Sequence, residues 1–125
     1  MGKHARAISR KTNPQLVGLV SRLYSLSAKE KSRLWRDVAH RLEGPAKARP
    51  SVNLSKLDRY CEDGETVLIP GKLLGAGNIS KKVTVSAFAH SGSAARKLAE
   101  AGCSLVSIDA LAESNPAGSK IRIII

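Results

Sequence analysis

Aromatic and acidic residues are both scarce in this sequence of 125 residues. Phe, Trp and Tyr together make up 3% of it, so a core has to be built mainly from aliphatic side chains. Asp and Glu number 10 against 21 Lys and Arg, which gives a formal net charge of +11. A charge of this size does not define a fold, but it favours polyanionic partners. Nucleic acid is the first such partner and an anionic membrane surface the second.

Long hydrophobic runs and paired cysteines are also missing. No stretch reaches the ~18–20 apolar residues that cross a membrane. No apolar signal-peptide core follows the N-terminus, so we expect neither membrane insertion nor export. Cys61 and Cys103 stand in unrelated contexts, which is typical of buried thiols in a reducing compartment. The hydrophobic content of 42% excludes a wholly disordered basic chain.

The positive charge is concentrated in the first two-fifths of the sequence. Residues 1–50 carry 12 Lys and Arg against 3 Asp and Glu, a net charge of +9. Residues 51–125 carry 9 against 7, a net charge of +2. Residues 1–12 contain no acidic residue and no apolar periodicity, so they cannot fold alone. They form either a solvated tail or an arm that becomes ordered on a polyanion, and we predict the arm.

A helical hairpin is predicted over residues 13–43. Asn13 and Pro14 are typical of a helix cap and first turn. Ser27–Glu30 has the pattern of a capping box that opens a second helix, ending at Glu43. The apolar stripe of this helix lies opposite a row of basic residues. That row is either a solvated face or part of an RNA footprint shared with the tail, and it consists of Lys29, Arg33, Arg36 and His40.

An α/β body is predicted over residues 53–125, after an open linker over residues 44–52. Short β-branched runs alternate with helices here, within a single domain. The expected strands are Thr66–Ile69, ended by Pro70 and Gly71, then Lys72–Leu74, Lys82–Ala89, Cys103–Ile108 and Lys120–Ile125. The expected helices are Asn53–Tyr60, one that Ser91 caps and that runs to Ala101, and one that Asp109 caps and that runs to about Ser114.

No catalytic, metal or cofactor site emerges from the motifs. The segment Gly71–Gly77 lacks the Gly-Lys-Ser/Thr ending of a phosphate loop, so it is either a tight turn or a backbone contact to RNA phosphates. Ser91 follows His90, but no acidic residue lies nearby to complete a triad. Neither Cys61, Cys103 nor the histidines show metal-ligand spacing. We therefore expect no small-molecule substrate.

Three segments carry a family resemblance: Val52–Tyr60, Asp63–Gly75 and Lys81–Phe88. In order and spacing they resemble the eighteen-e protein of the archaeal large ribosomal subunit. That family is related to eukaryotic large-subunit protein eighteen and bacterial large-subunit protein fifteen. The resemblance runs from Asn13-Pro14-Gln-Leu through Trp35-Arg-Asp-Val38 to the end of the chain.

The resemblance implies an irregular superhelical body of strand-strand-helix turns, preceded by a helical N-terminal part. It also implies a non-catalytic, cytoplasmic protein of the large ribosomal subunit, bound to ribosomal RNA and neighbouring ribosomal proteins. Two alternatives remain: a small RNA-processing or modifying enzyme that uses Gly71–Asn78 and His90, and a DNA-compacting architectural protein. The charge pattern, not the family, predicts these RNA-binding residues: Lys3, His4, Arg6, Arg10, Lys11, Lys29, Arg33, Arg36, His40, Lys47, Arg49, Asn53, Lys56, Lys72, Lys81 and Lys82.

Overall fold

The computed structural model describes residues 14–45, 47 and 49–125, which divide into two compact units. The hairpin unit takes in the described residues up to Arg49 together with Ala112–Gly118. The sheet unit comprises Pro50–Leu111 and Ser119–Ile125. The predicted tail and the predicted cap at Asn13 lie outside the described residues.

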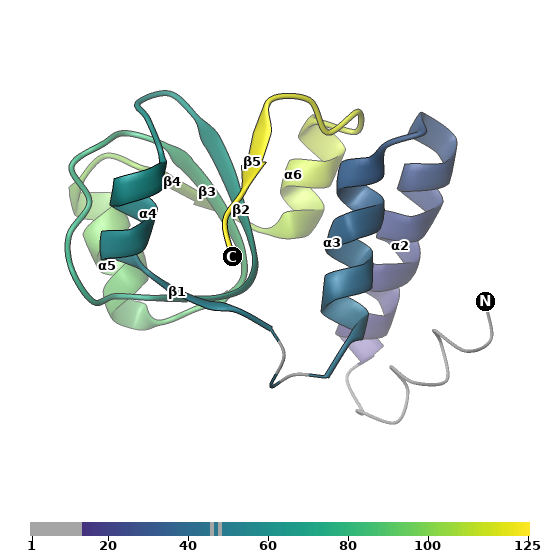
Figure 1. The fold of residues 1–125 in the computed structure, drawn as a ribbon, viewed down its shortest axis with the longest axis horizontal. Coiled ribbons are helices and arrows are strands. Elements are labelled where there is room, and N and C mark those ends of the chain that lie inside the picture. Colours follow the sequence, from purple (N-terminus) through teal and green to yellow (C-terminus); the bar gives the residue numbers. More distant parts are fainter. Residues whose placement is uncertain (1–13, 46, 48) are drawn as a thin grey trace. The chain divides into compact units, whose positions relative to one another are not determined.

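Two helices, α2 (Pro14–Glu30) and α3 (Arg33–Glu43), lie side by side in the hairpin unit (Figure 1). α2 begins at Pro14 as predicted, because proline needs no partner for an N–H in the first turn. Each helix buries one stripe of apolar side chains, and Trp35 of α3 is fully buried. The predicted helical hairpin is confirmed.

The predicted start of the second helix at Ser27 is wrong. Ser27 lies inside α2, where its buried hydroxyl donates to a backbone carbonyl one turn earlier at 2.8 Å. The helix ends at Glu30, the next residue, Lys31, is left-handed, and Ser32 occupies the N-cap position of α3. Lys29 therefore belongs to the last turn of α2 and not to the helix that carries Arg33.

The indole of Trp35 is held by a residue far away in the sequence. Its Nε1–H donates to the backbone carbonyl of Asn115 at 3.2 Å, across 80 positions of the chain. Both residues belong to the hairpin unit. Because a buried indole N–H without a partner is costly, this bond helps to fix the Asn115 loop against α3.

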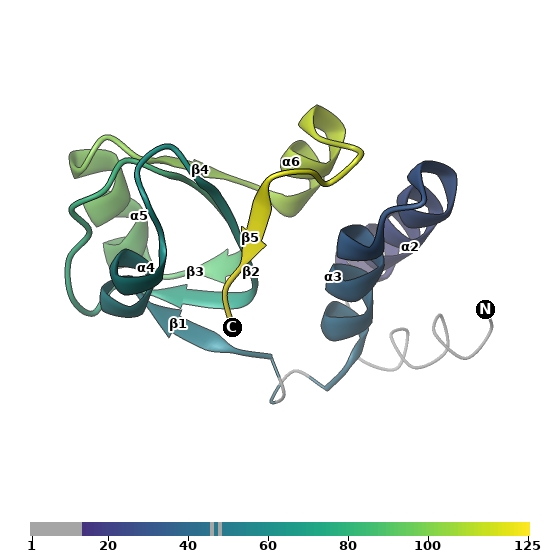
Figure 2. The ribbon, with the colours of Figure 1, turned by 45° about the horizontal axis from the view of Figure 1, so that its top comes forward.

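Five strands form one sheet in the sheet unit: β1 (Ser51–Asn53), β2 (Thr66–Leu74), β3 (Thr84–His90), β4 (Ser104–Val106) and β5 (Ile121–Ile123). The pairings are parallel, in the order β1-β2-β3-β4, and β5 also pairs with β2. β5 lies beside the start of β2 and β1 beside its end, as Figure 2 shows. The predicted α/β class is confirmed.

β2 is one continuous strand, so the prediction that it ends at Pro70 is wrong. Proline cannot donate to a ladder, and the pairing with β3 shifts register between Ile69 and Lys72, which accommodates it. The Lys72 N–H donates to the carbonyl of Pro50 at 2.9 Å. A Cβ on Gly71 would lie 2.1 Å from the same oxygen, so only glycine fits this approach. β1, which starts at Ser51, occupies the end of the predicted linker.

Three further helices, α4 (Leu54–Tyr60), α5 (Gly92–Glu100) and α6 (Ile108–Ser114), follow strands. Ser91 caps α5 as predicted, because its Oγ accepts from the Ala94 N–H at 3.2 Å. The predicted cap at Asp109 is wrong. Asp109 lies in the first turn of α6, and the Oγ of Ser107 accepts from the Ala110 N–H instead.

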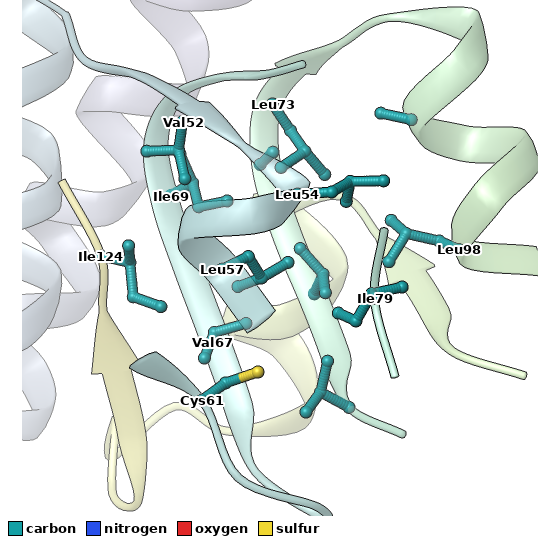
Figure 3. Packing of buried hydrophobic residues seen from close by; sticks show 14 residues of the cluster. Val52, Leu54, Leu57, Cys61, Val67, Ile69, Leu73, Ile79, Leu98 and Ile124 are labelled. Carbon is teal, nitrogen blue, oxygen red and sulfur yellow. The ribbon is translucent and has the colours of Figure 1, made fainter. Parts of the chain in front are cut away.

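The core of the sheet unit is aliphatic. Figure 3 shows Leu57 of α4 near Val67 of β2, and Leu98 of α5 beside Ile79 in the same cluster. Cys61 is buried at the edge of this cluster, and burial raises the pKa of its thiol. In the part of the chain that the structure describes, no helix is long and apolar enough to span a bilayer.

Candidate nucleic-acid interface

The outer face of α3 carries an exposed basic row, Arg33, Arg36 and His40, called here the α3 row. The opposite face is fixed inward because Trp35, Val38, Ala39 and Leu42 are buried. At ~100° per residue, members three and seven positions apart lie on one side of a helix. The exposed Asp37 shares that side, so the row is not uniformly positive.

A carboxylate is anchored beneath the end of the α3 row. Glu43 accepts a hydrogen bond from the Tyr24 hydroxyl at 2.7 Å, and its side chain is only 11% exposed. Burial, with help from the Glu43 hydrogen bond and charge, raises the pKa of Tyr24 to about 12. Nδ1 of His40 lies 3.5 Å from the same carboxylate, while its side chain remains 76% exposed. The imidazole is thus placed at the surface by an acid that faces inward.

Two cationic residues that follow α3, Lys47 and Arg49, differ in their exposure. Lys47 is exposed. Arg49 is half-buried, and its guanidinium donates to the carbonyl of Leu42 in the last turn of α3 at 3.1 Å. A cation at a helix C-terminus stabilises the helix through the exposed carbonyls. The structure therefore gives Arg49 a role in positioning α3.

The predicted RNA-binding residues of the sheet unit also form two groups, those that are half-buried and those that are exposed. The Lys81 ammonium donates to the carbonyls of Asp58 and Cys61 at the end of α4. Lys56 donates to the Ile125 carbonyl at 2.6 Å. Asn53 is half-buried at the N-cap position of α4, without a side-chain cap bond. Exposed side chains are found at Lys72 and Lys82.

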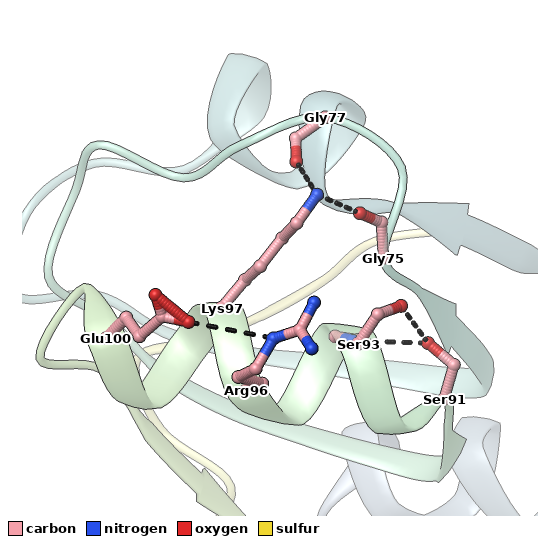
Figure 4. Close-up of polar contacts among 8 residues, drawn as sticks. Gly75, Gly77, Ser91, Ser93, Arg96, Lys97 and Glu100 are labelled. Atoms are coloured by element: carbon pink, nitrogen blue, oxygen red, sulfur yellow. Dashed lines mark hydrogen bonds and ion pairs between the residues drawn. The ribbon is translucent and has the colours of Figure 1, made fainter.

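The segment Gly75–Asn78, called here the glycine loop, is held by a lysine that was not expected. Lys97 of α5 donates to the carbonyls of Gly75 and Gly77, both at 2.8 Å (Figure 4). The Ser55 N–H of α4 donates to the carbonyl of Ala76 at 3.2 Å. The carbonyl oxygens of the loop thus accept hydrogen bonds from the protein's own donors, which fixes the loop against α4 and α5.

Sequence reasoning missed Lys97 and also Lys31. Lys97 lies next to the buried Leu98, and a lysine beside an apolar helix face was the available signal. Lys31 is exposed between Lys29 and Arg33. It was passed over because a continuous helix was expected through that position, whereas the structure forms a turn there.

His90 and Ser91 do not assemble into a nucleophile and base. The Ser91 hydroxyl is used in the α5 cap and lies 3.2 Å from the hydroxyl of Ser93. His90 is exposed at the end of β3. Within residues 14–45, 47 and 49–125, no group of three or more His, Cys, Asp or Glu side chains is arranged to hold a metal ion.

Comparison with known proteins matches this chain to ribosomal proteins. A family model whose description names the ribosomal proteins 50S-L15 and 50S-L18e, together with a 60S protein, matches residues 33–106. Large ribosomal subunit protein eL18 of Methanosphaerula palustris is 43% identical over 92% of this chain and 95% of its own length. The eL18 protein of Thermoplasma acidophilum is 41% identical over 93% of this chain and 97% of its own. The eL18 protein of Haloarcula marismortui is 43% identical over 91% of this chain and 97% of its own length. The chain therefore belongs to the ribosomal protein family that includes 50S-L15 and 50S-L18e.

Proposed function

We propose that the exposed basic residues of the hairpin unit bind phosphate groups of large-subunit ribosomal RNA. The chain is a structural, non-catalytic constituent of the large ribosomal subunit, as its family and its eL18 relatives indicate. Its partners are ribosomal RNA and neighbouring ribosomal proteins. Family membership favours this function over an RNA-processing enzyme or a DNA-compacting protein.

The observation that carries the proposal is the α3 row. Arg33 and Arg36 are exposed on a helix whose other face is locked by the buried Trp35. Phosphate contacts need cations that keep their donors available to the ligand, and these two side chains are placed that way. Each contact releases counterions from the RNA, so binding weakens with salt by ~0.7–0.9 log unit per log unit of salt.

The remaining predicted RNA-binding residues enter the proposal with different roles. The tail residues Lys3, His4, Arg6, Arg10 and Lys11 lie outside the described residues, and we propose that they extend the phosphate contacts. We propose that the exposed residues also contact phosphates: Lys29, His40, Lys47, Lys72 and Lys82. Arg49, Lys56 and Lys81 donate to backbone carbonyls, so we assign them positioning roles.

The sheet unit is the part that we expect to face neighbouring proteins. Its residues, Pro50–Leu111 and Ser119–Ile125, carry 9 Lys and Arg against 6 Asp and Glu, a nearly balanced charge. Several of the acids are already bonded. Glu65 pairs with Arg122 at 3.0 Å, and Asp58 accepts from the Ser80 N–H at 2.9 Å. Balanced, rigid surfaces of this kind suit protein contacts better than a phosphate backbone.

The test measures salt-dependent binding of the full chain to an in vitro transcript of archaeal large-subunit ribosomal RNA. The double substitution Arg33→Gln and Arg36→Gln removes two contacts and should flatten the slope of log K against log salt by about 1.5. Asp37→Asn removes a carboxylate that repels phosphate on the same face, and should tighten the Kd roughly 2- to 5-fold.

The matched control for Asp37→Asn is Glu100→Gln on α5, which makes the same charge change in the sheet unit. It should leave the Kd nearly unchanged. If the two neutralised acids improve binding equally, only the net charge matters and the α3 row is not the interface. An unchanged slope in the double arginine variant would have the same meaning.

A further inference from the structure

Lysine occupies two backbone positions that glycine would normally fill. Among the described residues, the non-glycine residues with positive φ are Lys31, at 53°, and Lys120, at 58°. The left-handed region brings Cβ close to the backbone carbonyl, so glycine favours it and, after glycine, Asn or Asp. Both lysine side chains belong to exposed residues. At both positions, glycine would adopt the observed backbone conformation with less strain than lysine does.

At Lys31 the chain geometry requires the left-handed conformation. The Ser32 N–H donates to the carbonyl of Ser27 at 3.0 Å, five residues back. This is the bond of a Schellman motif, in which the residue just before the donor is left-handed and is usually glycine. Only Lys31 and Ser32 separate α2 from α3, so the turn leaves no alternative.

At Lys120 the same conformation occurs without a helix end. Lys120 directly precedes β5, and Ile121 is paired with Thr66 of β2. A lysine at the C-terminus of a helix gains from the helix dipole, which offers a structural reason for Lys31. That reason is missing at Lys120, because α6 already ends at Ser114. The helix dipole therefore offsets part of the strain at Lys31 and none of it at Lys120.

We infer that Lys31 and Lys120 are phosphate-binding residues of the RNA interface, kept at glycine-type positions at the expense of stability. The inference rests on the proposed function and extends it to two residues outside the α3 row. A cation at the tip of a tight turn projects from the surface, where a phosphate can approach it without displacing protein contacts. Strained backbone kept at a ligand-binding position is a known exchange of stability for function.

The experiment uses the full chain and an in vitro transcript of archaeal large-subunit ribosomal RNA. Lys31→Gly and Lys120→Gly relieve the strain and remove one cation each. Each variant should raise Tm by about 2–5 °C and flatten the salt slope by ~0.7–0.9. Lys31→Arg keeps the cation and the strain, so it should leave both the slope and Tm close to those of the parent.

The charge-matched control is Arg96→Gln. Arg96 is exposed on α5, where it pairs with Glu100 at 3.7 Å, and its removal should not change the slope. If Arg96→Gln flattens the slope as much as Lys31→Gly, net charge alone explains the effect and the inference is wrong. It is also wrong if the glycine variants keep the parental slope, or if they lower Tm, since the lysines would then serve stability.

The same measurements distinguish failure of this inference from failure of the proposed function. If the Arg33 and Arg36 double variant flattens the slope while the glycine variants do not, the proposed function stands and only this inference fails. If none of these variants changes the slope, the proposed interface fails with it.

Discussion

Replacing Gly77 by alanine tests whether the glycine loop is fixed by close packing against α4. Gly77 has a φ of +88°, and a Cβ built on it would lie 2.6 Å from the Ser55 Cβ and 2.9 Å from the Ser55 nitrogen. Gly64 offers a matched comparison, because its φ is +83° but nothing lies within 4 Å of the added Cβ. The two substitutions share the backbone strain and differ in the steric overlap.

The shared strain of a left-handed alanine costs ~1–2 kcal/mol, and the lower entropy of the unfolded chain offsets ~0.4–1 kcal/mol of it. Gly64→Ala should therefore lower the free energy of unfolding by about 1 kcal/mol. At Gly77 the overlap adds ~1–3 kcal/mol. Displacing the Ser55 N–H from the Ala76 carbonyl adds ~1 kcal/mol. Gly77→Ala should thus cost about 3–5 kcal/mol.

The assay is urea unfolding of the full chain followed by far-ultraviolet circular dichroism, with the slope m checked for constancy. Fluorescence of Trp35, the single tryptophan, reports the hairpin unit in the same samples. Gly92→Ala serves as a further reference, because its added Cβ also meets open space and alanine favours the first turn of α5. Equal losses for Gly64→Ala and Gly77→Ala would refute the packing argument for the loop.

Two further predictions concern polar groups whose partners only the structure shows. Lys97→Met should lower the free energy of unfolding by ~1.5–3 kcal/mol, because the two hydrogen bonds to the carbonyls of Gly75 and Gly77 are lost. Lys82 is exposed, so Lys82→Met should change the free energy of unfolding by less than ~0.5 kcal/mol. Similar urea midpoints for the two variants would contradict this prediction. In a Tyr60→Phe background, an ultraviolet absorbance titration should show Tyr24 ionising with a pKa of about 12. The native state then holds the Tyr24 proton more tightly than the unfolded state, so stability should fall as pH rises from 10.0 toward 12, and less so in Tyr24→Phe. A midpoint near the ordinary pKa would contradict both the burial of the Tyr24 hydroxyl and its contact with Glu43.

Local patterns predicted the elements whose signals come from neighbours in the sequence. The apolar stripe around Trp35 gave α3 its buried face, and Ser91 marked the start of α5. Both signals depend on residues within one or two turns, so no distant contact was needed. The α/β class followed in the same way, from strands and helices that alternate along the chain.

Predictions failed where a distant or backbone contact overrides the local signal. Ser27 and Glu30 have the residue types of a capping box, but Ser27 is part of the buried face of α2 and the helix continues to Glu30. Pro70 interrupts a ladder in isolation, yet the carbonyl of Pro50 and a register shift carry β2 through it. Asp109 was expected to cap α6, but the cap bond comes from Ser107, two positions earlier in the chain.

The candidate interface shows the same division. Charge composition predicted that residues 1–50 bind a polyanion, because they carry a net charge of +9. Whether a given lysine is available to a ligand depends on what surrounds it. Lys81 and Lys97 serve carbonyls of their own chain, while Lys31 stands exposed on a left-handed turn.

The sequence by itself determined the charge distribution, the helical faces and the alternation of strands and helices, since these are properties of composition and of short-range spacing. The tertiary structure alone decided which cations are used internally, how Trp35 reaches Asn115, and how β1 and β5 come to lie along β2. These features depend on hydrogen bonds between residues that are far apart in the chain, and no local pattern encodes the distance between them.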